Sequence, residues 1–338
     1  MQFFSTSVGG QADARSLLRA IYESPVSAPI RKTHLEIIRS KEARETRQIC
    51  SANGFTEMSP ETIASLRKPQ SNTCFILGSG SSVNELPESA WKTIKTGFSI
   101  GINAWVSHDF NADAYSLEAD GLDEPPSTEI QAMSDALARK ARDNPETALF
   151  LLRPKRAELQ KRMAIIPSAL LDRSVMYGRF NLTTRNTNNL VGDLTYINRT
   201  TGPGRLPLPV VIDNGASVSR MISIAVVMGF RKVVLVGVDL NSGPYFWQAN
   251  AANGRYPDLK AHYPRQSGAL HDTLETVNRP FPTDKFIVAL SSSLRRRFGI
   301  SVSVGSEHSA LSACLPLYDW SNHTELPTYR TQVNSWRT

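Results

Sequence analysis

The chain has 338 residues, of which 41% are hydrophobic and 20% are charged, and its formal net charge is +7 at pH 7. This composition is ordinary for a globular protein with one large α/β domain or two modest ones. No apolar run reaches the roughly 18 residues that a transmembrane helix needs, and Met1 to Ala20 lack the regions of a secretory signal. The three cysteines are widely separated, which fits a reducing compartment and gives no metal-ligand spacing. We therefore expect a cytoplasmic protein.

The positive charge is scattered along the chain except at Arg295, Arg296 and Arg297, which end a predicted helix. Basic residues at this place complement the helix dipole. The alternative is attraction to an anionic substrate or to a membrane, which would place the protein at the inner membrane face. Because the chain has no aromatic-interleaved basic patch, nucleic acid is not an expected partner.

The first 70 residues differ in character from the rest. Residues 12–22 and 30–48 have helical, amphipathic patterns, and 56–68 predict a short capped helix. No glycine-rich loop occurs among them. We interpret 1–70 as a helical extension that packs on the main domain or on another copy of the chain, as in a homo-oligomer.

From Asn72 onward, short apolar runs alternate with helical stretches. The predicted strands are 74–77, 98–102, 114–117, 148–152, 209–212, 233–238 and 301–304, and the predicted helices are 127–142, 155–163, 214–228, 283–298 and 309–315. This alternation predicts an α/β fold with a doubly wound, mostly parallel, Rossmann-like sheet over 71–320. Polar segments at 164–208 and 244–282 are interpreted as lid insertions, and 321–338 as a tail.

The stretch from Cys74 to Ser82 is the strongest local signal. A short apolar strand runs into Gly78-Ser79-Gly80-Ser81-Ser82, and a polar, helix-like segment follows. Strand, glycine turn and helix can direct backbone N–H groups at an anion, which predicts a nucleotide-phosphate loop. The loop lacks the third glycine of a dinucleotide fingerprint, since Val83 stands there, and Asn103 replaces the acid that would bind ribose. It also lacks the Lys of a Walker loop.

Polar residues follow the predicted strands at their carboxyl ends. They are Ser79, Ser82, Asn103, Glu118, Asn214, Ser217 and Asp239. In a doubly wound fold all of them would line one crevice. Taken singly, each is better explained as a turn or helix cap than as a ligand, and it is their recurrence after successive strands that favours a shared site.

The second polar segment contains the histidines that could act as a general base. His262 and His271 lie there, and Tyr245 stands near its start. A neutral imidazole can accept a proton near pH 7, and a tyrosine hydroxyl can hold a phosphate. The alternative is a surface histidine. Since no metal-ligand motif occurs in the chain, we expect no metal.

The order of these elements resembles that of the metal-independent bacterial sialyltransferases that decorate lipooligosaccharide. Gly78 to Ser82 resembles their Gly-Asn-Gly-Pro-Ser loop, and Asn103 matches an asparagine that contacts phosphate. Residues 230–240 resemble the strand that ends in Gly-Ile-Asp-Phe, and Tyr245 matches a tyrosine that holds phosphate. The likeness spans about 72–318 and extends to the related flagellin glycosyltransferases, which share the loop and the Gly-x-Asp strand end.

The resemblance implies a GT-A-like variant fold and transfer of a sugar, such as sialic acid, from a CMP-activated donor to a glycan acceptor. It implies no cofactor or metal. His271, or alternatively His262, would deprotonate the acceptor hydroxyl, with inversion at the anomeric carbon. The donor-binding residues that it implies are Gly78, Ser79, Gly80, Ser82, Asn103, Glu118, Asn214, Ser217 and Asn241. Tyr245 is the second catalytic residue that it implies, and with Asn103 it would stabilise the departing CMP phosphate.

The chain departs from that family at several positions. Ser79 stands where the family has asparagine, and Asn241 where it has its first phosphate tyrosine. The histidine is further from the next helix than in the family. These departures keep two other hypotheses open, which are a Rossmann-type enzyme such as a methyltransferase and a non-catalytic nucleotide-sugar-binding protein.

Overall fold

The structure is a computed structural model that describes residues 24, 27–66, 68, 71–117, 128–155, 158–182, 184, 186–201, 210–241, 243–248, 281–322 and 324–326. Its strands are β1 (Thr56–Glu57), β2 (Thr73–Leu77), β3 (Phe98–Ile102), β4 (Ala114–Ser116), β5 (Ala148–Leu152), β6 (Ser174–Asn181), β7 (Val210–Asp213), β8 (Lys232–Val236), β9 (Ser301–Val304), β10 (Leu317–Asp319) and β11 (Thr324–Leu326). The α-helices are α2 (Ala28–Asn53), α3 (Pro60–Leu66), α4 (Glu88–Thr96), α5 (Thr128–Asp143), α6 (Leu159–Ile165), α7 (Ser168–Leu171), α8 (Thr187–Thr201), α9 (Ser217–Val227) and α11 (Thr283–Phe298). The 3₁₀ turns used below are η2 (Ser81–Glu85), η3 (Asn103–Ser107) and η7 (Ala310–Ala313).

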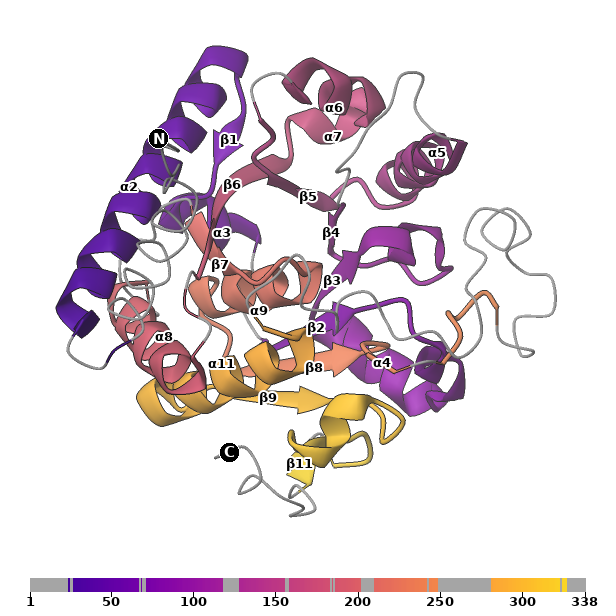
Figure 1. Ribbon diagram of the computed structural model, residues 1–338. Coiled ribbons are helices and arrows are strands. Elements are labelled where there is room, and N and C mark those ends of the chain that lie inside the picture. The colour runs from indigo at the N-terminus through magenta and orange to yellow at the C-terminus, as the bar shows by residue number, and fades with distance from the viewer. Residues whose placement is uncertain are drawn as a thin grey trace, which may run out of the picture.

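One sheet organises the molecule (Figure 1). Its strand order is β1-β6-β5-β4-β3-β2-β8-β9-β10-β11, and β7 pairs with the second half of β6. Every pairing is parallel except that of β10 with β11. The chain moves outward from β2 in both directions, so the prediction of a doubly wound, mostly parallel sheet is confirmed.

Helices cover both faces of the sheet because successive side chains of a strand point to opposite faces. In β2, Cys74 and Ile76 belong to one apolar core, and Phe75 and Leu77 belong to the other. The first core also takes side chains from α2, α8, α9 and α11, and the second from α4, α5, α6 and α7. Because helices cover both faces of the sheet, the side chains of the sheet that can reach a ligand are those where the strands end.

The predicted helical extension contributes to the sheet itself. The helix expected over 30–48 is α2, which packs on β6. The short helix expected over 56–68 begins only at Pro60, because Thr56 and Glu57 pair with Val175 and Met176 as strand β1. The helix expected over 12–22 lies outside the described residues.

The prediction of a lid over 164–208 is wrong for the part that the structure describes. Helix α7, strand β6 and helix α8 occupy 168–201, and β6 lies between β5 and β1 in the sheet. The polar residues that suggested a loop belong mainly to α8, in which Leu190 and Leu194 are fully buried. Most of the second expected lid, 244–282, lies outside the described residues. In the expected tail, Thr324–Leu326 pairs with β10.

Candidate functional site

From β2 the chain adds strands β3 to β6 on one side of the sheet and later β8 and β9 on the other, so the winding direction changes between β2 and β8. The loops after β2 and β8 face each other at this point. Such a switch point is where open α/β sheets bind ligands. The loop after β2 is Gly78 to Ser82, the predicted phosphate loop, and the loop after β8 runs from Gly237 to Asn241. The loop that the sequence singled out therefore lies at this switch point.

The glycines of this loop are explained by contact between the two loops. A Cβ atom on Gly78 would lie 2.6 Å from the carbonyl oxygen of Gly237. Gly237 has a φ of +64° and would in turn place a Cβ against the Gly78 carbonyl. The two backbones thus approach more closely than any side chain would allow.

The carboxylate of Asp239 fills the space that Gly80 leaves open. Its Oδ2 accepts a hydrogen bond from the Ser82 backbone N–H at 3.1 Å, and its Oδ1 accepts one from the Ser82 hydroxyl at 2.5 Å. Burial raises the pKa of Asp239, and the hydrogen bonds from Ser82 oppose that rise. The position that an anion would take in a phosphate loop is therefore taken by an acid of the chain itself.

This arrangement corrects the expected mechanism of the loop. Its N–H groups donate to the chain's own oxygen atoms: Gly78 to Val236, Gly80 to Gly237, Ser81 to Pro244, and Ser82 to Asp239. The strand is followed by the 3₁₀ turn η2, and α4 begins only at Glu88. In this conformation the loop therefore offers neither a row of open N–H groups nor a helix N-terminus to a phosphate.

We expect Gly80→Ala to lower the free energy of unfolding by about 1–3 kcal/mol, as overpacking does. The added methyl group would overlap the Asp239 carboxylate and lie 2.8 Å from the Gly237 carbonyl oxygen. Urea denaturation measures the change. Gly192→Ala is the matched control, because a Cβ on Gly192 in α8 would meet nothing within 4 Å. Equal stability of the Gly80→Ala protein and the unaltered protein would contradict this packing role.

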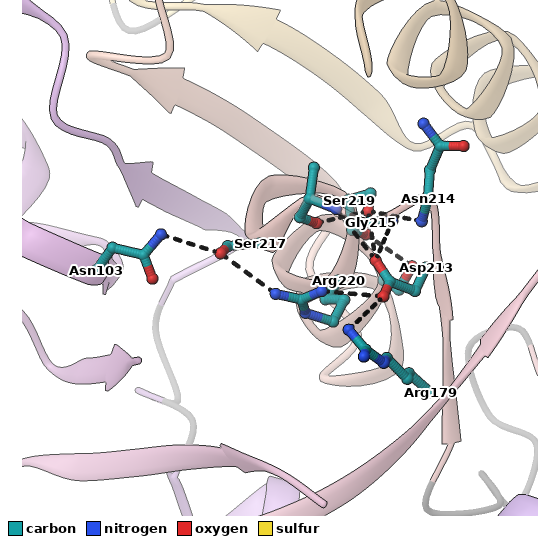
Figure 2. Close-up of polar contacts among 10 residues, drawn as sticks. Asn103, Arg179, Asp213, Asn214, Gly215, Ser217, Ser219 and Arg220 are labelled. Carbon is teal, nitrogen blue, oxygen red and sulfur yellow. Dashed lines mark hydrogen bonds and ion pairs between the residues drawn. The ribbon is translucent and has the colours of Figure 1, made fainter. Parts of the chain in front are cut away.

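A second polar group lies at the carboxyl end of β3, beside the switch point (Figure 2). Asn103 has a φ of +51°, an uncommon conformation that asparagine tolerates better than most residues. Its Nδ2 donates to the hydroxyl of Ser217 at 3.2 Å, and Nη2 of Arg220 donates to the same oxygen at 3.3 Å. Because two donors already occupy this oxygen, the Ser217 O–H is directed to an acceptor elsewhere.

Asp213, at the end of β7, anchors this group. Its Oδ2 pairs with Nη1 of Arg220 at 3.0 Å and with Nη1 of Arg179 at 3.2 Å. Its Oδ1 accepts the backbone N–H groups of Gly215 at 2.8 Å and Ala216 at 3.3 Å, which lead into α9. The carboxylate thereby fixes both the entry to α9 and the two arginines.

The Asp213 cluster carries a net positive charge, since two guanidinium groups face one carboxylate. Burial lowers the pKa of Arg220 to about 10, which leaves it protonated at neutral pH. Burial also raises the pKa of Asp213, and Arg179 opposes that rise. The N-terminus of α9 adds its dipole to the same corner. Figure 2 shows Arg220 reaching from Asp213 to Ser217, so the positive charge extends to the side of Asn103.

The other predicted site residues have varied positions. Tyr245 pairs with Gly80 in an isolated β-bridge, and its ring stacks on Trp247 with centroids 4.6 Å apart. Asn241 donates to the carbonyl of His308, and buried Asn214 donates to the carbonyl of Phe281, both at 2.8 Å. Each of these two asparagines therefore links its own loop to a distant segment of the chain by a side-chain hydrogen bond. Glu118, His262 and His271 lie outside the described residues.

Sequence reasoning missed the Asp213 cluster and one histidine. The available signal was an arginine inside the apolar helix 217–227, seven residues after an acid that ends a strand. His308, in the loop after β9, pairs with Glu85 of η2 at 2.8 Å when its imidazole is protonated. That contact joins the loop after β9 to the turn after β2, on either side of β8 in the sheet.

Comparison with models of known protein families and with curated proteins gives no match. Within the ranges given above, no helix combines the length and apolar character needed to cross a bilayer. The same residues contain no group of three or more His, Cys, Asp or Glu side chains that could hold a metal ion.

Proposed function

We propose that the protein is a glycosyltransferase of GT-A-like variant fold that uses a CMP-activated donor of sialic acid or a similar acidic sugar. The observation that carries this proposal is the donor-rich corner formed by Asn103, Ser217 and Arg220 at the carboxyl edge of the sheet. It joins an amide, a hydroxyl, a helix N-terminus and excess positive charge. These groups suit a phosphate or a sugar carboxylate.

In the proposed reaction, an acceptor hydroxyl of a glycan attacks the anomeric carbon of the donor, and CMP leaves with inversion. Negative charge grows on the phosphate as the glycosidic bond to CMP breaks. The Asn103 amide and the Ser217 O–H would stabilise that charge, with Arg220 behind them, and Tyr245 would contribute its hydroxyl. His271 would remove the proton of the acceptor hydroxyl. No step in this scheme requires a metal.

In this proposal the glycine loop lies beside the nucleotide rather than around its phosphate. Since Asp239 occupies the anion position of the loop, the phosphate would lie toward Asn103, and Gly78 to Ser82 would form the wall beside the nucleotide. Asp239 would also repel a phosphate that approached the loop directly. The proposed reaction takes place in the cytoplasm, at the inner membrane face if the acceptor is lipid-linked.

We expect the protein to release CMP from CMP-sialic acid in the presence of EDTA, and His271→Ala to lower the rate by at least about 10²-fold, as loss of a general base does. The measurement is CMP release followed by chromatography. His308→Ala is the matched control, because His308 lies at the same edge but pairs with Glu85. Unchanged turnover in the His271→Ala protein would disprove the assignment of the base. Failure to bind any CMP-sugar in calorimetry would disprove the class.

The occupied loop favours a second candidate, a nucleotide-sugar-binding protein without turnover. The N–H groups of the glycine loop and the Ser82 hydroxyl already donate to oxygen atoms of the chain. A ligand could therefore bind at Asn103 without being activated by the loop. Binding of a CMP-sugar together with absence of hydrolysis and transfer would select this candidate. Tight binding of S-adenosylmethionine would instead favour a methyltransferase.

A further inference from the structure

Helices α2, α8 and α11 border a second polar site, an open hollow on the surface away from the switch point. It is a hollow of about 400 Å³ lined by Lys32, Val191, Gly192, Thr195, Tyr196, Ser293, Arg296 and Arg297. Figure 1 shows α8 packed between α2 and α11. The last turn of α11 precedes β9, so Arg296 and Arg297 lie at the amino end of that strand. The hollow is thus separate from the proposed transferase site, which lies at the carboxyl ends of the strands.

The lining of this α2–α8–α11 hollow is basic and contains no carboxylate. Lys32, Arg296 and Arg297 supply three positive charges. None of the ion pairs between described residues involves any of the three. The nearest acid along α2, Glu36, lies beside the hollow, where it hydrogen-bonds with Tyr196 and pairs with Arg39 at 2.5 Å. Three cations that share one concave surface repel each other unless an anion joins them.

The floor of the hollow supplies hydroxyl groups and an aromatic ring. The Thr195 and Ser293 hydroxyls meet at 3.3 Å and join α8 to α11. The Lys32 ammonium lies 5.4 Å from the centroid of the Tyr196 ring, which holds that flexible side chain over the hollow. Hydroxyl and ammonium groups together are a common environment for phosphoryl oxygens.

Gly192 is an independent sign that this space is kept open. It lies inside α8, where glycine is less favourable than alanine because it loses more backbone entropy. Elsewhere in the chain a glycine is required by close packing, as at Gly80, but a Cβ on Gly192 would meet nothing within 4 Å. Packing therefore gives no reason for glycine at this position, whereas a ligand resting on the helix would.

We propose that the α2–α8–α11 hollow binds a phosphate-bearing ligand, whose phosphoryl oxygens contact Lys32, Arg296 and Arg297. The chemistry is shared by a soluble phosphorylated compound and by the headgroup of an anionic lipid. The volume of about 400 Å³ accommodates a phosphoryl or pyrophosphoryl group with a few further atoms. This site does not depend on the proposed transferase activity.

The test uses the full-length protein and two probes, with binding measured at low salt. Calorimetry with inorganic pyrophosphate is expected to show one site, and Arg297→Ala to weaken it about tenfold, as loss of one charge-assisted contact does. Gly192→Asp should abolish binding by placing a carboxylate in the hollow. Arg295→Ala is the matched control, because it removes the same charge from the same helix turn but Arg295 does not line the hollow.

The second arm, flotation with phosphatidylcholine vesicles with and without phosphatidic acid, identifies the source of the phosphate. Loss of vesicle binding in Arg297→Ala but not in Arg295→Ala would assign a lipid headgroup, and pyrophosphate binding alone would assign a soluble ligand. An excess of CMP should displace neither probe. Equal weakening by Arg295→Ala and Arg297→Ala, or absence of binding to both probes, would overturn the proposal. Gly192→Ala checks that a side chain at this position leaves the fold intact. It should raise the melting temperature, because alanine is more favourable than glycine inside a helix and its Cβ would meet nothing within 4 Å.

Discussion

Replacing Asp213 by alanine is expected to lower the free energy of unfolding by about 3–5 kcal/mol. The change leaves Arg220, which is completely buried, without its carboxylate partner. It also frees the N–H groups of Gly215 and Ala216 at the entry to α9. An uncompensated buried charge is costly because the low-dielectric interior replaces its hydration. Urea denaturation followed by circular dichroism measures the change.

Two further variants separate the charge effect from loss of packing. Asp213→Ala combined with Arg220→Met removes both buried charges of the cluster and should recover most of the lost stability, since an apolar chain fills the remaining space and Arg179 is 37% exposed. Glu88→Ala removes the acid of the exposed pair with Lys92 and should change stability by less than about 0.5 kcal/mol. A loss below about 1 kcal/mol in Asp213→Ala would contradict the structural importance of the cluster.

Removing the side chain of Asn103 is expected to lower the rate of CMP release by about 10²–10³-fold, the usual effect of losing one donor to a developing anion. Asn103→Gly is the preferred variant, because it removes the side chain with its amide while glycine accepts the φ of +51° without strain. Asn103→Ala should lose the same activity and also some stability, since alanine is unfavourable at this φ. The measurement is CMP release from CMP-sialic acid with EDTA present.

Comparing Asn103→Gly with Asn103→Ala separates an effect on the ligand from an effect on folding. If Asn103→Gly retains the melting temperature of the unaltered protein and loses turnover, the amide acts on the ligand and not on the fold. Turnover within about threefold of the unaltered protein would show that Asn103 does not stabilise the departing group. If negative charge develops on the donor phosphate beside residue 103, Asn103→Asp should release CMP more slowly than either variant, because its carboxylate repels that charge.

The strands of the sheet were predictable because each is a short apolar run with both faces buried. Residues 74–77, 98–102, 148–152 and 301–304 were located almost to the residue. Strand β6 was missed because Ser174–Asn181 mixes polar and apolar residues and lies in a stretch rich in asparagine and threonine. Its place between β5 and β1 is determined by pairing with distant strands, which local patterns do not record.

The candidate site, like the sheet, was predicted from the sequence only in part. The sequence identified Gly78, Gly80, Asn103 and Ser217, since glycines and polar residues after strands mark the carboxyl edge of a parallel sheet. The contact of Asn103 with Ser217 joins residues 114 positions apart. Arg220 was passed over because an arginine inside an apolar helix becomes meaningful only when its partner, Asp213, is seen beside it.

The sequence by itself determined the fold class and identified the glycine-rich loop after the first strand of the alternation, because these depend on hydrophobic periodicity and on turn residues. The switch point depends on the strand order, which only the structure shows. The tertiary structure alone decided what the loop does with its N–H groups. Gly80 looked like a place for a phosphate, but its missing side chain makes room for Asp239, which lies 159 residues later in the chain. A glycine permits close approach by any neighbour, and only the folded chain determines which neighbour occupies the space.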